Sequence, residues 1–419
     1  MLVIYNLLIF FIILLSPLII LFRLTKGKED FSRFKEKFCF FSINNNTKKK
    51  LIWFHGASVG ELLSIIPLIE KLEKNNSIGK ILITSTTLSS SRVLDKYKFK
   101  KTIHQFFPID SIYFTNKFLN YWKPSMAVFV ESEIWPNMIV NIKKKDIPLI
   151  LLNARISSKT FKRWKIFSNF SNFIFKKFDL CLAQSLETKK YLKFLGAKKI
   201  RFCGNLKFSE SKQDNKLFSK EKFSFNFNSR KIWCASSTHP NEEIDCAKIH
   251  QNLRKKYNNI LTIIIPRHIN RTNEIKKKIE ELGLVVSLRS SNNQIKKNTD
   301  IYLVDTYGET KKFYKYSKIV FLGGSLPISS KKGGQNPIEA ARLGATIIHG
   351  PNVSNFKEVY KLFNKKLISH QAKNALELET LVERLIQKSK IKTNKYSKIR
   401  NIGSNILKKT YSEIVCYIK

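Results

Sequence analysis

The stretch LIWFHGASVGELLSIIPLIEKL, residues 51–72, changes its pattern near its middle. The apolar run 51–54 is typical of a buried strand, and it breaks into a loop that contains two glycines. An amphipathic run begins after Glu61 and predicts a helix. The stretch therefore predicts a strand–loop–helix turn with one carboxylate in the first turn of the helix.

Strand-like runs of the same kind recur along the rest of the chain, with amphipathic stretches between most of them. In the first half they are residues 51–54, 80–86, 126–130, 148–154 and 180–185. In the second half they are residues 231–237, 260–266, 284–288, 300–305, 318–325 and 345–351. This alternation predicts two α/β halves, each a parallel sheet with helices on both faces, and a ligand-binding cleft at the carboxyl ends of the strands.

The chain has 419 residues, which is more than one hydrophobic core usually serves. We expect an N-terminal segment over residues 1–24, a first domain over 25–207 and a polar linker over 208–230. The second domain covers 231–419, and its last helix is free to pack back on the first domain.

Residues 2–22 carry no charged side chain and as a helix would span about 31 Å, the thickness of a bilayer core. A cleaved signal peptide would place its basic residues before the apolar run. Here they follow it, which favours an uncleaved single-pass anchor with the body of the protein in the cytoplasm. The cations are Arg23, Lys26, Lys28, Arg33, Lys35 and Lys37.

A second candidate membrane contact is residues 161–178, where Phe and Ile alternate with Lys and Arg. Phe167, Phe170, Ile174 and Phe178 recur at helical spacing. Such a helix can lie on an anionic membrane surface or pack on its own domain, and its amphipathic pattern does not separate the two.

The formal net charge of +45 favours an anionic partner such as a lipid surface, a phosphorylated substrate or nucleic acid. Lysines are spread over most predicted faces, so part of the excess is compositional, and no nucleic-acid-binding motif accompanies it. The six cysteines form no C-x-x-C pair, which fits a reducing compartment and no zinc site. His55 and His239 show no metal-ligand spacing and are interpreted as hydrogen-bonded loop residues.

The strand ends of the second half carry features of a nucleotide site. Glycine-rich turns and helix N-termini offer N–H groups and a positive dipole to phosphate. Arg267 follows the run 260–266 and can grip a phosphate with two donors. Glu339 follows Asn-Pro at a helix start, where it either accepts from ribose hydroxyls or simply stabilises the helix. No G-x-G-x-x-G or Walker loop supports a dehydrogenase or an ATPase.

Carboxylates follow two strands of the first half. Glu61 either stabilises its helix N-terminus or acts as a general base, with the helix dipole favouring its ionised form. Glu131 and Glu133 are two residues apart after an apolar strand, so they are expected to face opposite sides. Lys207 precedes the linker and would place a positive charge at the domain junction.

Nine short motifs occur in one order: FHGASVGE, ESEIWPN, NARIS, GNLKF, ASSTHPNEE, PRHINR, DTYGE, FLGGS and GGQNPIEAA. Together with the preceding apolar segment, they resemble the 3-deoxy-D-manno-octulosonic acid (Kdo) transferases, which add Kdo to lipid A in lipopolysaccharide synthesis. The resemblance extends from residues 27–34 to 349–356.

The resemblance implies a GT-B fold of two Rossmann-like domains with an interdomain cleft, and a site at the cytoplasmic side of the bacterial inner membrane. The first domain would bind a lipid A precursor and the second the donor CMP-Kdo, with no further cofactor, metal or nucleic acid. By the same resemblance Glu61 would be the general base, and Glu131 and Lys207 would support the transition state. Nucleotide contacts would come from Pro266, Arg267, Tyr307, Gly308, Glu309, Asn336, Pro337, Ile338 and Glu339.

The implied reaction is a direct displacement that inverts the anomeric centre. The acceptor hydroxyl loses its proton to one carboxylate, and Arg267 with backbone donors stabilises the departing CMP. One alternative is a GT-B transferase that uses another nucleotide sugar. Another is a membrane-anchored basic protein that binds nucleic acid or lipid without catalysis, in which case binding should fall steeply with salt.

Overall fold

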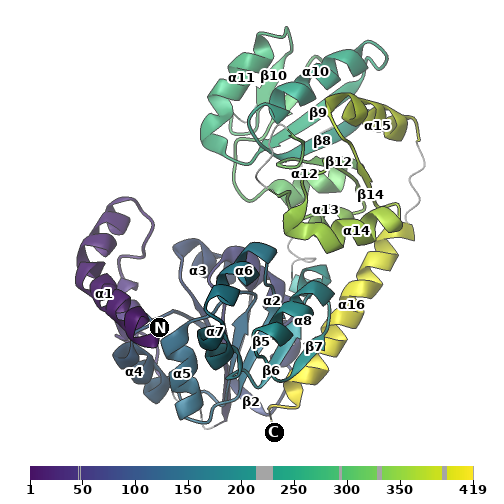
Figure 1. Ribbon diagram of the computed structural model, residues 1–419. Coiled ribbons are helices and arrows are strands. Elements are labelled where there is room, and N and C mark those ends of the chain that lie inside the picture. Colours follow the sequence, from purple (N-terminus) through teal and green to yellow (C-terminus); the bar gives the residue numbers. More distant parts are fainter. Residues whose placement is uncertain are drawn as a thin grey trace. The chain divides into compact units, whose positions relative to one another are not determined.

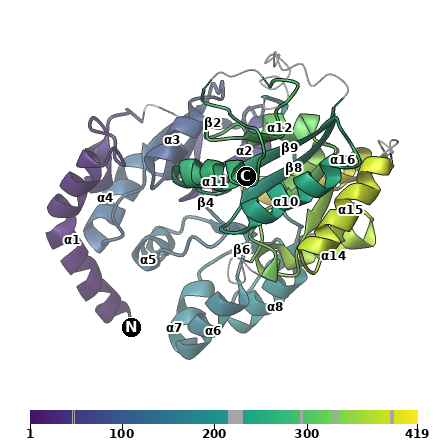
Figure 2. The same ribbon diagram turned by 90° about the horizontal axis from the view of Figure 1, so that it is seen from above.

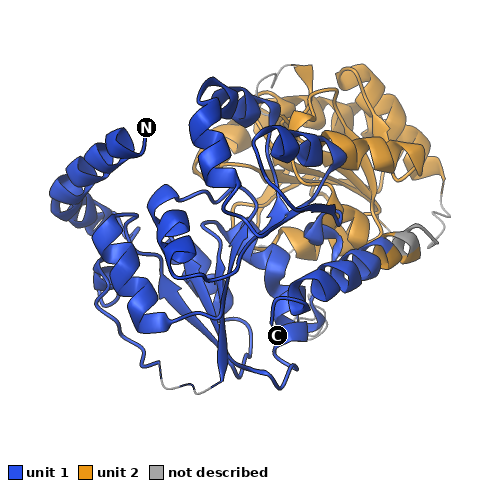
Figure 3. Ribbon diagram, turned by 60° about the horizontal axis from the view of Figure 1, so that its bottom comes forward, with its two compact units in different colours: residues 1–216, 402–419 blue, residues 217–401 orange. Residues whose placement is uncertain are grey.

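The computed structural model describes residues 1–45, 47, 49–213, 230–291, 295–327, 333–388 and 394–418. The chain divides into two compact units, one formed by residues 1–216 with 402–419 and the other by residues 217–401 (Figure 3). Among the described residues, each unit contains a seven-stranded sheet whose pairs are all parallel. The prediction of two α/β halves is confirmed. Most of the predicted linker lies outside the described residues.

The sheet of unit 1 has the order β3-β2-β1-β4-β5-β6-β7. Its strands are β1 (Lys50–His55), β2 (Ile78–Ser85), β3 (Thr102–Phe106), β4 (Met126–Val130), β5 (Leu149–Ala154), β6 (Leu180–Ala183) and β7 (Ile200–Phe202). The strand predicted from residues 51–54 is central, since Trp53 is in register with Leu82 of β2 and Ala127 of β4. The sequence missed β3 and β7, which form the two edges and so need no continuous apolar run.

Helices cover both faces of this sheet because alternate residues of its strands are buried on opposite sides. Trp53 and Phe129 belong to one core cluster with Phe118 and Ile139, whereas Phe54 is buried outside that cluster. The helices are α2 (Val59–Leu72), α3 (Leu88–Leu94), α4 (Ile112–Trp122), α5 (Pro136–Lys144), α6 (Ser158–Ile166), α7 (Ser168–Phe175) and α8 (Leu186–Phe194), with a 3₁₀ turn η2 (Leu206–Phe208). Each large core side chain contributes about 2 kcal/mol through burial.

Unit 2 repeats the plan with the order β10-β11-β9-β8-β12-β13-β14. Its strands are β8 (Lys231–Thr238), β9 (Ile260–Pro266), β10 (Val286–Leu288), β11 (Ile301–Leu303), β12 (Ile319–Leu322), β13 (Thr346–His349) and β14 (Ser369–Gln371). Its helices include α10 (Glu242–Arg254), α11 (Thr272–Glu280), α12 (Thr310–Tyr316), α13 (Ile338–Arg342), α14 (Lys357–Lys365) and α15 (Ala375–Gln387). Only β14 was missed by the sequence analysis, and it is a three-residue edge strand.

The last helix, α16 (Asn394–Val415), belongs to unit 1 from residue 402 onward. Gly403 lies so close to the chain at Phe208 that a Cβ there would come within 2.1 Å of the Phe208 carbonyl oxygen. Ser209 donates a hydrogen bond to the Gly403 carbonyl. The glycine therefore permits a close approach between α16 and η2.

The N-terminal helix α1 (Leu2–Thr25) is apolar on every side, and most of its side chains are exposed. Within the described residues it is the one helix long and apolar enough to cross a membrane. Both of its ends contact other residues of unit 1: the Tyr5 hydroxyl donates to Asp110 at 2.7 Å, and Arg23 pairs with Glu29 at 2.6 Å. Figures 1 and 2 agree in placing α1 beside α4. These contacts were not expected of a helix that crosses a bilayer.

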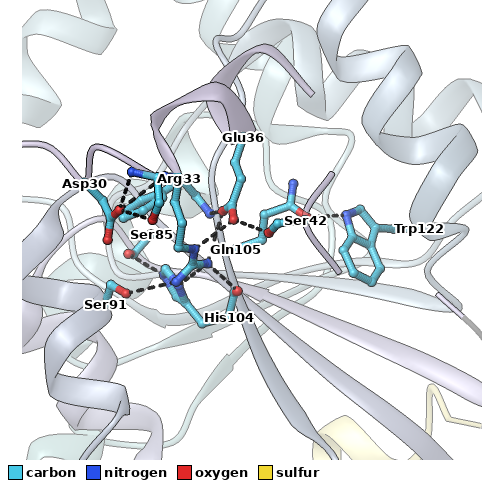
Figure 4. Close-up of polar contacts among 11 residues, drawn as sticks. Asp30, Arg33, Glu36, Ser42, Ser85, Ser91, His104, Gln105 and Trp122 are labelled. Atoms are coloured by element: carbon cyan, nitrogen blue, oxygen red, sulfur yellow. Dashed lines mark hydrogen bonds and ion pairs between the residues drawn. The ribbon is translucent and has the colours of Figure 1, made fainter. Parts of the chain in front are cut away.

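A polar network holds the segment after α1 against the sheet (Figure 4). Arg33 donates to Glu36 at 2.8 Å and to the carbonyl oxygen of His104 in β3 at 2.7 Å. Glu36 also accepts from the Phe106 N–H at 2.8 Å. Burial, and then the charge of Arg33, lower the pKa of His104 to about 3, so this histidine is neutral. Arg33 therefore helps to hold this segment on the sheet.

Residues 161–178 form two helices, α6 and α7, which meet at Phe167. The prediction of one continuous helical stripe was therefore wrong. Ile174 and Phe178 belong to the core of unit 1, as the packing interpretation required. Ile166 and Phe167 are 74% and 47% exposed, so the α6–α7 junction keeps an apolar surface.

Candidate active site

Glu61 lies in the first turn of α2 at the carboxyl end of β1, and it is 9% exposed. Its Oε2 accepts hydrogen bonds from the backbone N–H groups of Ala57 at 2.7 Å and Ser58 at 3.1 Å. Ser58 caps the helix in return, which completes a capping box. Both hydrogen bonds end on Oε2, so the capping box uses only one of the two carboxylate oxygens.

The N–H groups at the helix N-terminus favour ionised Glu61, as expected, but other effects outweigh them. Burial, followed by the charge of Glu133, raises the pKa of Glu61 to about 7, against the lowering effect of the Ser58 and Ala57 amides. Desolvation and like charge therefore outweigh the helix N-terminus. A carboxyl group with a pKa near neutrality is well matched to accept a proton.

Glu131 and Lys207, two residues of the predicted site, form an ion pair of 2.5 Å within unit 1. Glu131 is 4% exposed, and Asn153 donates to it at 3.4 Å. The Asn153 side chain also accepts from the Leu206 N–H at 3.0 Å, which ties β5 to η2. Unit 1 thus brings together the carboxyl end of the sheet and the segment before the linker.

The sequence placed Glu131 and Glu133 on opposite sides of an extended chain, so only one of the two was expected to face the site. Glu131 instead has a positive φ of 58°, which ends the strand and turns the chain. Both carboxylates then raise the pKa of Glu61. The Oε2 atom of Glu133 lies 3.2 Å from Nε2 of His55, which is fully buried.

In unit 2, the residues after β8 and β12 are drawn together by Glu242, a buried carboxylate that the sequence analysis missed. Its oxygens accept from the N–H groups of His239 at 2.9 Å and Gly324 at 2.7 Å, and from Ser325 and Leu326 at 3.3 Å. The Arg267 N–H, next to Pro266, donates to the Thr238 carbonyl at 3.0 Å while the Arg267 side chain is exposed.

The three predicted nucleotide contacts Tyr307, Gly308 and Glu309 differ in their surroundings. Tyr307 is 78% exposed and Gly308 has a positive φ of 82°, so this loop presents a side chain and open backbone. Glu309 is engaged within the unit by Arg289 at 3.0 Å and by Thr306 at 2.5 Å. Burial would raise the pKa of Glu309, but these hydrogen bonds lower it. Glu309 therefore has local partners of its own.

Asn336, Pro337, Ile338 and Glu339 form the start of α13. The Asn336 side chain accepts from the Ile338 N–H at 3.1 Å, and Ile338 is buried. The Glu339 side chain, 36% exposed, lies 3.2 Å from Lys311. Across the described residues, no group of three or more His, Cys, Asp or Glu is placed to hold a metal ion.

The two sheets define the class of protein. Solved structures of UDP-N-acetylglucosamine 2-epimerases share the fold, for example those from Listeria monocytogenes (TM-score 0.61, 14% identity, 88% of this chain and 95% of that one) and Neisseria meningitidis (0.58, 15%, 88% and 99%). At this identity the likeness is one of fold alone. The chain is therefore a GT-B-like protein of two Rossmann-like domains.

Sequence comparison gives the family. A family model described as 3-deoxy-D-manno-octulosonic-acid transferase (kdotransferase) matches residues 32–210. The transferase of Rickettsia bellii is 34% identical over 404 residues, which cover 96% of this chain and 94% of the relative. A probable mitochondrial one from Arabidopsis thaliana is 34% identical over 397 residues, 90% and 86% of the two chains. The chain belongs to the Kdo transferase family and is a glycosyltransferase.

Proposed function

We propose that this enzyme transfers Kdo from CMP-Kdo to a lipid A precursor by direct displacement, with inversion and with Glu61 as the general base. The observation that carries the proposal is Glu61 itself: a buried carboxyl at the carboxyl end of the central strand, with a pKa raised to about 7 by burial and by Glu133. Such a group is ionised in half of the molecules near neutral pH and is basic enough to take a hydroxyl proton.

The neighbouring charges fit the rest of the reaction. Lys207, held by Glu131, offers a cation near the base, where it can stabilise charge on the reacting sugar. In unit 2, the exposed Arg267 side chain and the loop around Gly308 would bind the CMP phosphate and ribose, together with Pro266, Tyr307, Glu309 and the 336–339 turn. CMP would leave as a phosphate monoester stabilised by these donors, without metal or further cofactor.

The test is CMP release from CMP-Kdo in the presence of a lipid A precursor, measured for the wild type, Glu61→Gln and Glu187→Gln. Glu187 is a matched control because it also lies in the first turn of a helix of unit 1, where it is exposed. We expect Glu61→Gln to lose about 10²- to 10⁴-fold in kcat with CMP affinity unchanged, and Glu187→Gln to be as active as the wild type. A folded wild-type protein that releases no CMP would instead favour the non-catalytic binding protein.

We also propose that α1 places the enzyme at the bacterial inner membrane with both units in the cytoplasm. Its exposed apolar side chains and the cations after them support this. The single pass expected from the sequence is tested by Val3→Cys, whose side chain is 80% exposed, with a membrane-impermeant thiol reagent. Labelling from the periplasm supports the pass, and labelling only from the cytoplasm means that the Tyr5–Asp110 contact keeps α1 on one side of the bilayer.

A further inference from the structure

His55, the last residue of β1, precedes the loop that hydrogen-bonds Glu61 and also faces a second carboxylate, Glu133. It is fully buried and stacks on Phe107 with ring centroids 3.8 Å apart. Its Nδ1 lies 3.0 Å from Oγ1 of Thr84 in β2, and its Nε2 lies 3.2 Å from Oε2 of Glu133. The ring therefore has one partner on a neighbouring strand and another on the loop after β4.

The ring nitrogens of His55 face oxygen atoms on both sides. Nδ1 lies 3.3 Å from the Thr84 carbonyl oxygen as well as 3.0 Å from the Thr84 hydroxyl. That hydroxyl accepts from the Trp53 indole at 2.9 Å and has the Phe54 carbonyl oxygen within 3.4 Å. On the other side of the ring, a proton on Nε2 faces the Glu133 carboxylate, whereas a lone pair there would repel it. A proton on Nε2 thus lets His55 stabilise the Glu133 anion.

Glu133 is kept ionised although it is largely buried. The Trp135 indole donates to its Oε2 at 2.8 Å. Burial alone would raise the pKa of Glu133, but the contacts with His55 and Trp135 lower it. Glu61 belongs to the same turn, because it accepts from the N–H of Ala57, two residues after His55. A Cβ on the intervening Gly56 would lie 3.3 Å from the Glu61 Cβ.

The other charges around Glu61 are balanced differently. Glu131 approaches from the same loop as Glu133, but Lys207 of η2 pairs with it at 2.5 Å and cancels much of its charge. Arg155, after β5, donates its backbone N–H to the Glu131 carbonyl at 3.1 Å. Glu133 has a histidine and an indole as partners instead of a lysine. Of the two carboxylates, Glu133 raises the pKa of Glu61 more than Glu131 does.

We propose that Glu133 is a positioning residue whose fixed negative charge, held in place by His55 and Trp135, sets the pH at which Glu61 takes up the acceptor's proton. This inference rests on the proposed function, in which Glu61 is the base. Without Glu133, Glu61 would stay ionised to lower pH and would be a weaker base. The arrangement keeps a buried carboxyl basic enough to remove a proton from a sugar hydroxyl.

The test is the pH profile of kcat/KM between pH 5 and 9 for the wild type, Glu133→Gln and Glu133→Asp. Glu133→Gln keeps the shape of the side chain but loses its charge. In this variant we expect the acidic limb of the pH profile to move down by about half a pH unit or more, which corresponds to a roughly threefold or larger loss of proton affinity at Glu61. Glu133→Asp keeps the charge and should keep the limb near its wild-type position. Equal shifts in both variants would assign the effect to lost packing and overturn the proposal.

Two further outcomes separate this inference from the proposed function. If Glu61→Gln is inactive but the limb of Glu133→Gln does not move, Glu61 remains the base and the role of Glu133 is refuted. If Glu61→Gln stays active, the base assignment itself fails.

A second measurement serves if Glu133→Gln does not fold. The infrared band of protonated carboxyl groups in the wild type, minus that in Glu61→Gln, should show one group that titrates near pH 7. The subtraction removes Asp110, a buried carboxyl whose pKa is also raised to about 7. An empty difference spectrum would mean that Glu61 does not hold the proton, and it would overturn the account of Glu133.

Discussion

Glu61 in unit 1 and Glu242 in unit 2 occupy corresponding places in two similar sheets. Each lies in the first turn of the helix that follows the central strand, β1 or β8, and each is buried. Glu61 accepts two N–H groups from its own loop on a single oxygen. Glu242 accepts four on both oxygens, three of them from the loop after β12.

The difference shows how one carboxylate position serves two purposes. Glu242 has its hydrogen-bonding capacity filled by backbone donors and joins two loops, so its charge is used for structure. Glu61 keeps one oxygen outside the capping box and has like charges nearby, so its ionised form is disfavoured. A group of the first kind should control stability, and one of the second kind should control reactivity.

The largest expected effect is the loss of stability in Glu242→Ala. Four buried or partly buried N–H groups would lose their acceptor, and each unsatisfied donor costs about 1 kcal/mol or more. We expect unit 2 to lose at least about 3 kcal/mol, whereas Glu61→Ala should lose about 1 kcal/mol because only a capping interaction is removed. Denaturant unfolding followed by tryptophan fluorescence measures both. Similar losses in the two variants would remove the distinction between the two carboxylates.

A second test uses the pH dependence of stability. The folded pKa of Glu61, about 7, lies above its usual value of 4.5, so the folded chain binds an extra proton between these pH values. Its stabilising contribution is therefore complete below about pH 4.5 and is lost as the pH rises through 7.

Glu61→Gln stands in for the protonated form. We expect the wild type to lose about 1–3 kcal/mol relative to this variant between pH 5 and pH 8.5, measured by denaturant unfolding at both pH values. Other titrating groups cancel in the comparison. A difference that is the same at both pH values would show that Glu61 is ionised throughout.

The sequence correctly predicted the position of Glu61 in the strand–loop–helix turn, but it did not predict the groups that surround this side chain. The strand–loop–helix turn is local, so its pattern over residues 51–72 was sufficient. The charges that act on Glu61 come from a distant part of the chain, the turn that holds Glu131 and Glu133. No local signal marks a positive φ at a glutamate, because glycine and asparagine usually fill such positions.

In unit 2, too, the sequence showed local features but not the contacts between distant residues. The glycines at 323 and 324 belong to the FLGGS motif, and a Cβ on Gly323 would lie 2.6 Å from Glu242 Oε2. The carboxylate that requires them was missed, because its partners are about 80 residues away along the chain. Burial that depends on contacts between distant segments leaves no signal in the hydrophobic periodicity of the sequence.

Alanine substitutions at two glycines give a third test of the comparison between the Glu61 and Glu242 sites, with smaller expected changes in stability. Gly324 has a positive φ of 65°, and a Cβ there would lie 2.8 Å from the His239 ring, so Gly324→Ala should cost about 1–2 kcal/mol. Gly60, beside Glu61, has open space around its Cβ position. Gly60→Ala should leave thermal stability unchanged or slightly higher, because alanine favours a helix. A loss of activity in Gly60→Ala without a loss of stability would show that this glycine makes room for substrate.

The smallest expected change in stability is that of Glu339→Gln, and it tests whether unit 2 also holds a carboxylate free for a ligand. Glu339 pairs with Lys311 at 3.2 Å, but its side chain is 36% exposed. Ion pairs of this exposure contribute about 0–1 kcal/mol, so the unfolding midpoint should hardly move. If Glu339 accepts from the ribose hydroxyls of the donor, the KM for CMP-Kdo should rise several-fold while kcat is kept. An unchanged KM would mean that Glu339 only stabilises its helix. Glu242 and Glu339 would then both be structural.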